Sequence, residues 1–345
     1  MLDKKTILRI KNIYTAHAFQ VNGEVFVGAG SETDPDVRLC RFGQSSEEKI
    51  PDCPGGMMSF IPVPGNAGSY VSIMGLFPPF IGGEAGLFLH QFSDGGWRTV
   101  KAMNLPFAHR CEFIRKGDDL FLAAATVSRY KENPADWSQP GELHIIHMNS
   151  QKALPWNSEV LAQKLIRNHG MCRIKMHGTE VLCISGAEGI FAIQPEADAW
   201  QLVPIIQREV SEMSFMDLDG DGIDELVTIE PFHGETLCIY KHDGKDWHLR
   251  YSDSLSFGHG LSTGFFMGKP RVVVGNRAGS LALEMFSVDN LDQGALKREV
   301  IESEAGPTQT QVFKAGKKEY ILSANQRKHE VAIYSGMIDG STGQG

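Results

Sequence analysis

The side chains best suited to chemistry in this chain are four histidines that recur in a repeating pattern. His17, His109, His169 and His259 stand at or just before short apolar runs, and Gln309 takes the matching place near the C-terminus. Imidazoles gathered around one point bind a transition metal or act as a general base. We predict that His109 and His169 are catalytic. Ligands of a divalent metal, such as Mn²⁺ or Zn²⁺, are predicted to be His17, His259 and Gln309.

A second group of candidate ligands lies in one short segment, Asp217-Leu-Asp-Gly-Asp-Gly-Ile-Asp-Glu225. Its glycines let the chain curl tightly, so that carboxylates two residues apart converge on one point. We predict an oxygen cage for a structural Ca²⁺ ion or another hard cation, made by the side chains of Asp217, Asp219, Asp221 and Glu225 and the carbonyl of Ile223.

The elements that would position these residues form a loose internal repeat, with a spacing of roughly 40–60 residues and about seven copies. Each copy reads as three or four short strands separated by turns, as in His109-Arg-Cys-Glu-Phe, Leu120-Phe-Leu-Ala and Leu143-His-Ile-Ile-His. This pattern predicts an all-β, seven-bladed β-propeller, with six or eight blades as the alternatives. The strand Thr6–Ile10 is expected to complete the last blade and close the ring. Only Ser158–Arg167 suggests a short helix.

Propeller topology places the two groups of ligands on opposite faces. First strands line the central channel, so the four histidines at their entries are expected to converge at its mouth. The Asp217–Glu225 segment lies between a first and a second strand, and therefore on the other face. The alternative for the histidines is that each is a separate, hydrogen-bonded residue that fills the channel mouth.

Loops from second to third strands bring further polar groups to the histidine face. The loop around Tyr130 is an unusually long insertion through Gly141, and long ordered loops are often functional. We predict Arg129 and Tyr130 as catalytic residues, while other loops also carry polar groups such as His233. Because Arg and Lys bind carboxylates, substrate-binding roles are predicted for Lys131, Arg277 and Arg327. The alternative is that these loop charges are simply solvated.

Composition narrows the class of protein. The net charge of −9 argues against nucleic acid as a partner, because no basic excess neutralises phosphates. No segment reaches the roughly 18 apolar residues of a membrane span, and no signal peptide is evident, so we predict a cytoplasmic protein without a membrane partner. The six cysteines show no CxxC pair, and Cys111, Cys172, Cys183 and Cys238 lie in apolar strand patterns, so buried free thiols are expected. Residues 1–336 are predicted to form one domain and 337–345 a flexible tail.

The Asp217–Glu225 segment resembles the FG-GAP/VCBS repeat of propeller proteins, whose blades often carry such a cation loop. The layout of histidines and Gln309 is similar to that of two groups of propeller enzymes. Cytoplasmic oligogalacturonate lyases carry a His/Gln metal site on a seven-bladed propeller, and sugar dehydratases act on anhydrofructose or aldosulose. Only this general layout is shared, since no diagnostic motif of either group is matched.

Together these features predict a carbohydrate-active lyase or dehydratase that performs β-elimination on a sugar or uronic acid. Elimination needs a base for a C–H proton and a cation for the developing enolate charge, and a histidine cluster with Arg and Tyr supplies both. The expected partner is a small carbohydrate or sugar acid. The alternative is a non-catalytic FG-GAP/VCBS-type propeller that acts as a ligand-binding or protein-interaction scaffold. Scattered histidines and an apolar rim patch would favour that alternative.

Overall fold

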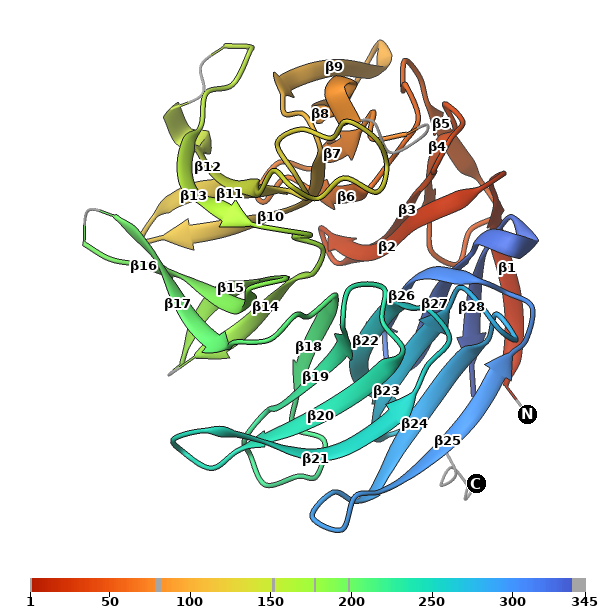
Figure 1. The fold of residues 1–345 in the computed structure, drawn as a ribbon. Coiled ribbons are helices and arrows are strands. Elements are labelled where there is room, and N and C mark those ends of the chain that lie inside the picture. The colour runs from red at the N-terminus through yellow and green to blue at the C-terminus, as the bar shows by residue number, and fades with distance from the viewer. Residues whose placement is uncertain (1, 78–81, 151–152, 177, 198, 337–345) are drawn as a thin grey trace.

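The computed structural model describes residues 2–77, 82–150, 153–176, 178–197 and 199–336. The predicted C-terminal tail, 337–345, lies outside the described residues. Seven four-stranded antiparallel sheets are arranged as blades around a central channel, with the first strand of each blade innermost (Figure 1). The structure therefore confirms the predicted seven-bladed β-propeller.

The blades follow one another in sequence, and six of them are formed by four consecutive strands. Their strands are β2 (Ile13–Val21), β3 (Glu24–Ser31), β4 (Val37–Arg41) and β5 (Glu47–Ile50) in blade 1; β6 (Ser59–Pro62), β7 (Ser69–Met74), β8 (Gly86–Ser93) and β9 (Gly96–Asn104) in blade 2; β10 (Ala108–Lys116), β11 (Asp119–Thr126), β12 (Gly141–His147) and β13 (Glu159–Leu165) in blade 3; β14 (Met171–Met176), β15 (Thr179–Gly186), β16 (Gly189–Pro195) and β17 (Trp200–Ile206) in blade 4; β18 (Glu212–Met216), β19 (Glu225–Glu230), β20 (Thr236–His242) and β21 (Trp247–Ser254) in blade 5; and β22 (Gly258–Phe266), β23 (Lys269–Asn276), β24 (Leu283–Asn290) and β25 (Ala295–Glu302) in blade 6.

Blade 7 closes the ring with strands from both ends of the chain. It contains β26 (Pro307–Ala315), β27 (Lys318–Asn325) and β28 (Glu330–Ser335), and β1 (Asp3–Arg9) pairs antiparallel with β28 as its fourth strand. Figure 1 shows the two ends of the described chain meeting at this blade. The predicted N-terminal closure is confirmed. Without β1, the backbone groups along one side of β28 would be unpaired at a sheet edge.

Second strands are apolar on both faces because each blade is packed between two neighbours. In β23 the run Val272-Val-Val is fully buried, and β11 buries Leu122-Ala-Ala-Ala in the same way. Such strands lose the alternation of apolar and polar residues that marks a half-exposed sheet. The core therefore lies between blades, as separate apolar clusters such as the one that joins Leu8 of β1 to Ala16 of β2.

One element differs from the sequence prediction. The segment expected as a short helix, Ser158–Arg167, forms β13, the outer strand of blade 3, which pairs with β12. Pairing with an existing sheet gives the backbone its hydrogen bonds, and this tertiary gain exceeds a weak local helix preference. The described residues contain three short 3₁₀ helices, η1 (Gly82–Glu84), η2 (Met148–Ser150) and η3 (Gln326–Lys328), and no α-helix.

The six cysteines are all free, as predicted, and only Cys172 is partly exposed. Among the described residues, no helix has the length and apolar character needed to cross a membrane.

Candidate functional site: a histidine cluster at one end of the channel

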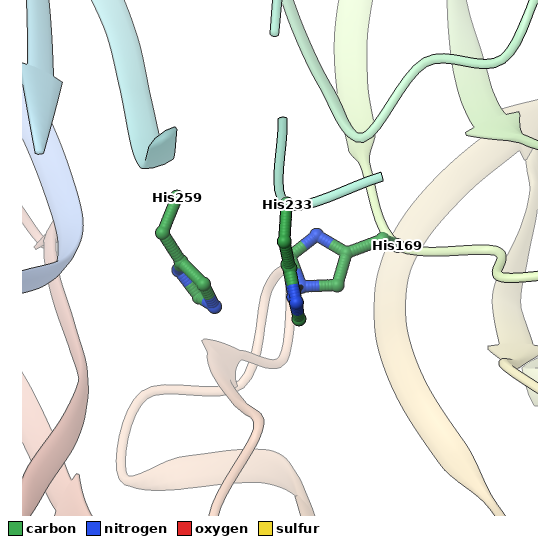
Figure 2. A group of neighbouring side chains, drawn as sticks. All are labelled: His169, His233 and His259. Atoms are coloured by element: carbon green, nitrogen blue, oxygen red, sulfur yellow. Dashed lines mark hydrogen bonds between the residues drawn. The ribbon is translucent and has the colours of Figure 1, made fainter. Parts of the chain in front are cut away.

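Three histidines converge where blades 4, 5 and 6 meet the channel (Figure 2). His169 precedes β14, His233 lies in the connection between β19 and β20, and His259 lies near the start of β22. One ring nitrogen from each lies within 4.8 Å of the others, and the Nε2 atoms of His169 and His233 are 3.3 Å apart. Nitrogens about 2.0–2.1 Å from a tetrahedral metal ion are separated by a similar distance. The ring of His109, from β10, lies 4.4 Å from that of His169.

The connection that carries His233 is fixed by its own backbone. Gly234 leaves no room for a side chain, since a Cβ atom there would lie 2.1 Å from the carbonyl oxygen of Glu230. The backbone N–H of His233 donates to Ser211 Oγ at 3.1 Å, and its ring stacks on Phe232 with centroids 3.9 Å apart. A tight loop and an aromatic neighbour therefore hold the imidazole over the channel.

Outer partners orient the other two imidazoles. His259 Nδ1 donates to the carbonyl oxygen of Thr308 at 2.6 Å. His169 Nδ1 lies 2.7 Å from Glu212 Oε1, although the approach is oblique for a hydrogen bond. When Nδ1 carries the proton, Nε2 keeps its lone pair, and this arrangement is the common one for metal-binding histidines. The two rings thus present Nε2 to the centre of the cluster.

A partly buried arginine supports the Glu212 carboxylate. Arg110 Nη2 donates to Glu212 Oε1 at 2.9 Å, and its Nη1 donates to the carbonyl of Met58 at 3.0 Å. Burial alone would raise the pKa of Glu212, but Arg110 and His169 together bring that pKa below its ordinary value. Glu212 is therefore an anion, which favours the proton on the facing nitrogen of His169.

The four imidazoles are neutral. Burial lowers the pKa of His109, His169 and His259, each only 1% exposed, and it lowers the pKa of the half-buried His233 to about 2. Neighbouring histidines and arginines lower the pKa values of His109, His233 and His259 further. Neutral imidazole is the form that binds metal ions, so the protein holds these side chains ready for coordination at neutral pH.

A tyrosine joins the cluster from blade 1. Tyr14 Oη lies 3.1 Å from His259 Nε2 and 3.5 Å from His109 Nε2. Burial raises the pKa of Tyr14 to about 12, against the opposing charges of Arg110 and Arg277, so the phenol is protonated at neutral pH. Tyr14 and His109 therefore bring a proton donor and a proton acceptor to one point beside the three converging histidines.

A cavity of about 250 Å³ adjoins the cluster inside the channel and is bordered by all seven inner strands. His259, Glu212 and Arg110 line it, so the cluster and the cavity share a wall. A small ligand in the cavity would lie next to the groups that orient and surround the histidines.

Two predicted metal ligands lie further along the channel. His17 is in the middle of β2, with Nδ1 3.4 Å from the carbonyl of Phe60, and Gln309 Oε1 accepts from the backbone N–H of Ala16 at 3.1 Å. Both line the cavity. Among the described residues, neither belongs to the group of nitrogens that converge.

The long insertion before β12 lies beside the cluster, but the residues predicted there differ in their exposure to solvent. Tyr130 is 61% exposed, and Arg129 bonds to Gln139 of the same loop. Lys131 is buried with its Nζ 3.3 Å from the centroid of the Trp137 ring. Trp137 packs against Phe232, which in turn contacts the rings of His169 and His233. The loop therefore reaches the cluster through Trp137.

The two remaining predicted substrate-binding residues are arginines of blades 6 and 7. Arg277 donates to Gln326 Oε1 at 2.5 Å and lies 3.9 Å from Glu32, with its guanidinium 5.8 Å from the Tyr14 ring. Arg327 packs against Gly306 in the connection into β26. Arg277 thus belongs to the surroundings of the cluster.

Sequence reasoning gave no role to Tyr14, Arg110 or Glu212, and it left His233 as one polar loop residue among several. Arg110 directly follows His109, and Glu212 opens β18, the one inner strand of this half of the ring whose entry lacks a histidine. Glu212 therefore occupies the repeat position that holds a histidine in neighbouring blades, and this position could have identified it as a candidate from the sequence.

The second group of predicted ligands also converges, but a lysine shares its centre. Oxygens of Asp217, Asp219 and Asp221 lie within 4.8 Å of one another. Lys241 Nζ, from the neighbouring strand β20, is 2.5 Å from Asp219 Oδ2 and 2.8 Å from Asp221 Oδ2. An ammonium group therefore neutralises part of the acidic loop from within the protein.

The inner end of this loop carries a buried carboxylate. Glu225 is fully buried, with Oε2 accepting from the backbone N–H of Leu218 at 2.7 Å and Oε1 without a partner among the described residues. Burial raises the pKa of Glu225 to about 7. The side chain of Ile223 is about half exposed, and its backbone N–H donates to Asp221.

Comparison with known proteins identifies the fold alone. No family model matches the chain, and no curated protein matches it. One chain from the crystal structure of the mitotic checkpoint complex matches with a TM-score of 0.64 and 10% sequence identity, over 98% of this chain and 94% of that chain. In total 581 chains of solved structures match, and a fold shared so widely says nothing about chemistry.

Proposed function

We propose that this protein is a metal-dependent carbon–oxygen lyase or dehydratase that acts on a sugar or uronic acid at the histidine end of the channel. The observation that carries the proposal is the convergence of the neutral imidazoles of His169, His233 and His259 beside the Tyr14–His109 pair. Three imidazoles suit Zn²⁺ or Mn²⁺ and leave further coordination positions for a substrate oxygen.

The residues around the cluster divide the proton transfers of an elimination. When bound, a divalent metal stabilises the negative charge that develops on a substrate carboxylate or carbonyl. Neutral His109 accepts the proton from the carbon next to that group, the bond from the β-carbon to oxygen breaks, and Tyr14 donates its proton to the departing oxygen. The products are an α,β-unsaturated acid or carbonyl compound and an alcohol or water, so protons and electrons balance. Arg277 supplies positive charge beside Tyr14 for an acidic substrate.

We also propose that the Asp217–Glu225 loop binds a structural Ca²⁺ ion in competition with Lys241. The unpartnered Glu225 Oε1 and the three converging aspartates favour a hard cation, whereas the ammonium occupies two of the same oxygens. This site is far along the blade from the histidines and has a stabilising role only.

The test of the lyase proposal is elemental analysis followed by an activity screen. Wild-type protein is expected to bind one transition metal that His169→Ala/His233→Ala loses, while calcium content stays the same. Metal-loaded protein is then incubated with uronic acids and uronate oligomers, and an increase in ultraviolet absorbance reports a conjugated product. Binding of no transition metal by the folded wild-type protein would contradict the proposal and leave a binding propeller as the better description.

A further inference from the structure

Access to the channel increases with distance from the histidines. In β26 the first residues, Pro307 and Thr308, are buried, and those from Gln311 onward are half-buried or exposed. In β22, Gly258–Gly260 are buried and residues 261–264 are half-buried, before Phe265 is exposed and Phe266 packs into the core. Inner strands run along the channel, so this gradient means that solvent reaches it from the face opposite the histidine loops.

The histidine end is covered by aromatic side chains. Phe232 lies between Trp137 of the long insertion and the rings of His169 and His233. Phe257 contacts the other side of His233, with ring centroids 4.8 Å apart. The guanidinium of Arg167 lies 5.4 Å from the Trp137 ring and 5.6 Å from the Phe232 ring. These contacts leave little room for a ligand to reach the cluster from above.

The cavity below the cluster has a mixed lining, in which hydroxyl and amide groups are as frequent as apolar side chains. Its polar lining includes Ser59, Ser214, Ser262, Thr263 and Gln311, and Arg110 and Glu212 lie where it meets the histidines. Hydroxyls that both donate and accept hydrogen bonds suit a polyhydroxylated ligand, and the guanidinium of Arg110 suits its carboxylate. The volume of about 250 Å³ is below the range of about 300–1,000 Å³ that holds drug-sized ligands.

We infer that the ligand of the histidine cluster enters through the channel from the face opposite the histidine loops, and that it is a hydroxy acid no larger than a monosaccharide. The inference rests on the proposed function for its chemistry. It excludes a polymer chain laid across the loop face, because the cluster is covered there and the chamber is too small for several sugar units.

The route is tested by the rate at which a chelator removes the metal. Wild-type protein, Ser262→Trp and Ser138→Trp are loaded with Co²⁺, and pyridine-2,6-dicarboxylate is added while the cobalt absorption band is followed. Ser262 lines the cavity, whereas Ser138 is exposed on the insertion above the histidines, so the pair compares the same change at the two ends. Removal from Ser262→Trp is expected to be roughly tenfold slower or more, since escape then requires a conformational opening. Removal from Ser138→Trp is expected at the wild-type rate.

The proposed route would be overturned if the chelator removed metal from Ser262→Trp at the wild-type rate. It would also be overturned if removal were slow from Ser138→Trp alone. If Ser262→Trp does not fold, as judged by circular dichroism, Ser214→Trp provides the same obstruction from β18.

The size limit is tested by calorimetric titration with D-galacturonate and tri-galacturonate, with and without metal. The monomer is expected to bind wild-type and Ser138→Trp protein but not Ser262→Trp, and the trimer is expected not to bind. Tight binding of the trimer, or no binding of the monomer, would overturn the ligand class. If the wild-type protein binds no metal, the proposed function fails, and titration of the metal-free protein still decides whether the channel admits the monomer.

Discussion

Glu212 is the residue on which the orientation of the cluster depends most. One of its oxygens lies within 3 Å of both His169 Nδ1 and Arg110 Nη2, so the carboxylate links the imidazole to a fixed charge. Partners of this kind fix the tautomer of a metal-binding histidine and raise its basicity. Glu212 and Arg110 thus fix the orientation of His169, although neither is one of the converging imidazoles.

Replacing Glu212 with Gln is expected to lower metal affinity about 10–100-fold, because the neutral amide no longer favours the proton on His169 Nδ1. Competition titration with a metal-binding dye measures the change. Glu112→Gln is the matched control, since Glu112 also lines the cavity and binds an arginine, Arg173, but does not touch the cluster. Equal losses from both variants would show that net charge in the channel, and not the orientation of His169, sets the affinity.

Tyr14→Phe tests the proton donor separately from the metal. The pKa of Tyr14, raised to about 12, keeps its proton available across the neutral range. Tyr14→Phe removes this proton donor and is expected to lower the turnover number of the elimination by about 100-fold or more, while metal content is unchanged. Loss of metal from Tyr14→Phe would instead assign the hydroxyl to coordination.

At the scale of elements, the fold depends on contacts that join strands of different blades. The closing strand β1 is held by Lys4, whose Nζ lies 2.6 Å from Glu302 Oε1 of blade 6 and 2.5 Å from Glu330 Oε1 of blade 7. Glu302 also accepts from Tyr334. Lys328 also pairs with Glu302, so the Lys4 ammonium is the cation that the two acidic groups share where the ring closes.

Lys4→Met is expected to lower the free energy of unfolding by about 1–3 kcal/mol, because two partly buried carboxylates lose a shared cation. Chemical denaturation at neutral pH measures the loss. Lys5→Met, on the same strand and without an ion pair among the described residues, is expected to change stability little. Similar effects for both variants would mean that the closure relies on backbone pairing alone.

Lys241→Gln tests the competition at the acidic loop between β18 and β19. Removing the ammonium frees the oxygens of Asp219 and Asp221, so Ca²⁺ is expected to raise the melting temperature of this variant more than that of the wild type. Thermal scans with Ca²⁺ and with EDTA measure the difference. Lys245→Gln, an exposed lysine of the next turn, serves as the control. A melting temperature of Lys241→Gln that Ca²⁺ does not raise at all would show that the loop does not bind calcium, and a rise equal to that of the wild type would show that Lys241 does not compete.

For the whole molecule, the buried neutral imidazoles of the cluster and of His90 in β8 have a consequence for stability. His90, His109, His169, His233 and His259 all have lowered pKa values in the folded protein, caused first by burial. Below the ordinary pKa of 6.5 the unfolded chain binds protons at these sites and the folded chain does not. Acid therefore favours unfolding.

We expect the metal-free protein to lose stability as the pH falls from about 6.5 toward 4, with each buried neutral histidine contributing about 1.4 kcal/mol per pH unit. Denaturant titrations between pH 8 and pH 4 measure this slope. His90 lies away from the cluster, and His90→Gln is expected to reduce the loss of unfolding free energy per pH unit by the contribution of one histidine. A stability that stays constant down to pH 5 would contradict the neutral state of the cluster.

The sequence by itself determined the architecture, because seven similar units can bury their apolar faces only against one another, and an orphan strand such as Thr6–Ile10 has one place to pair. It also indicated that His109, His169 and His259 share one end of the channel, since a repeat position fixes both strand and height. Only the tertiary structure decided which of these residues meet. Closing the ring brings Tyr14 to His259 across 245 positions. The connection after β19 swings His233 over the channel, while His17, further along β2, points to a lower level. Such distances are set by radial packing and loop conformation, which no spacing along the chain encodes.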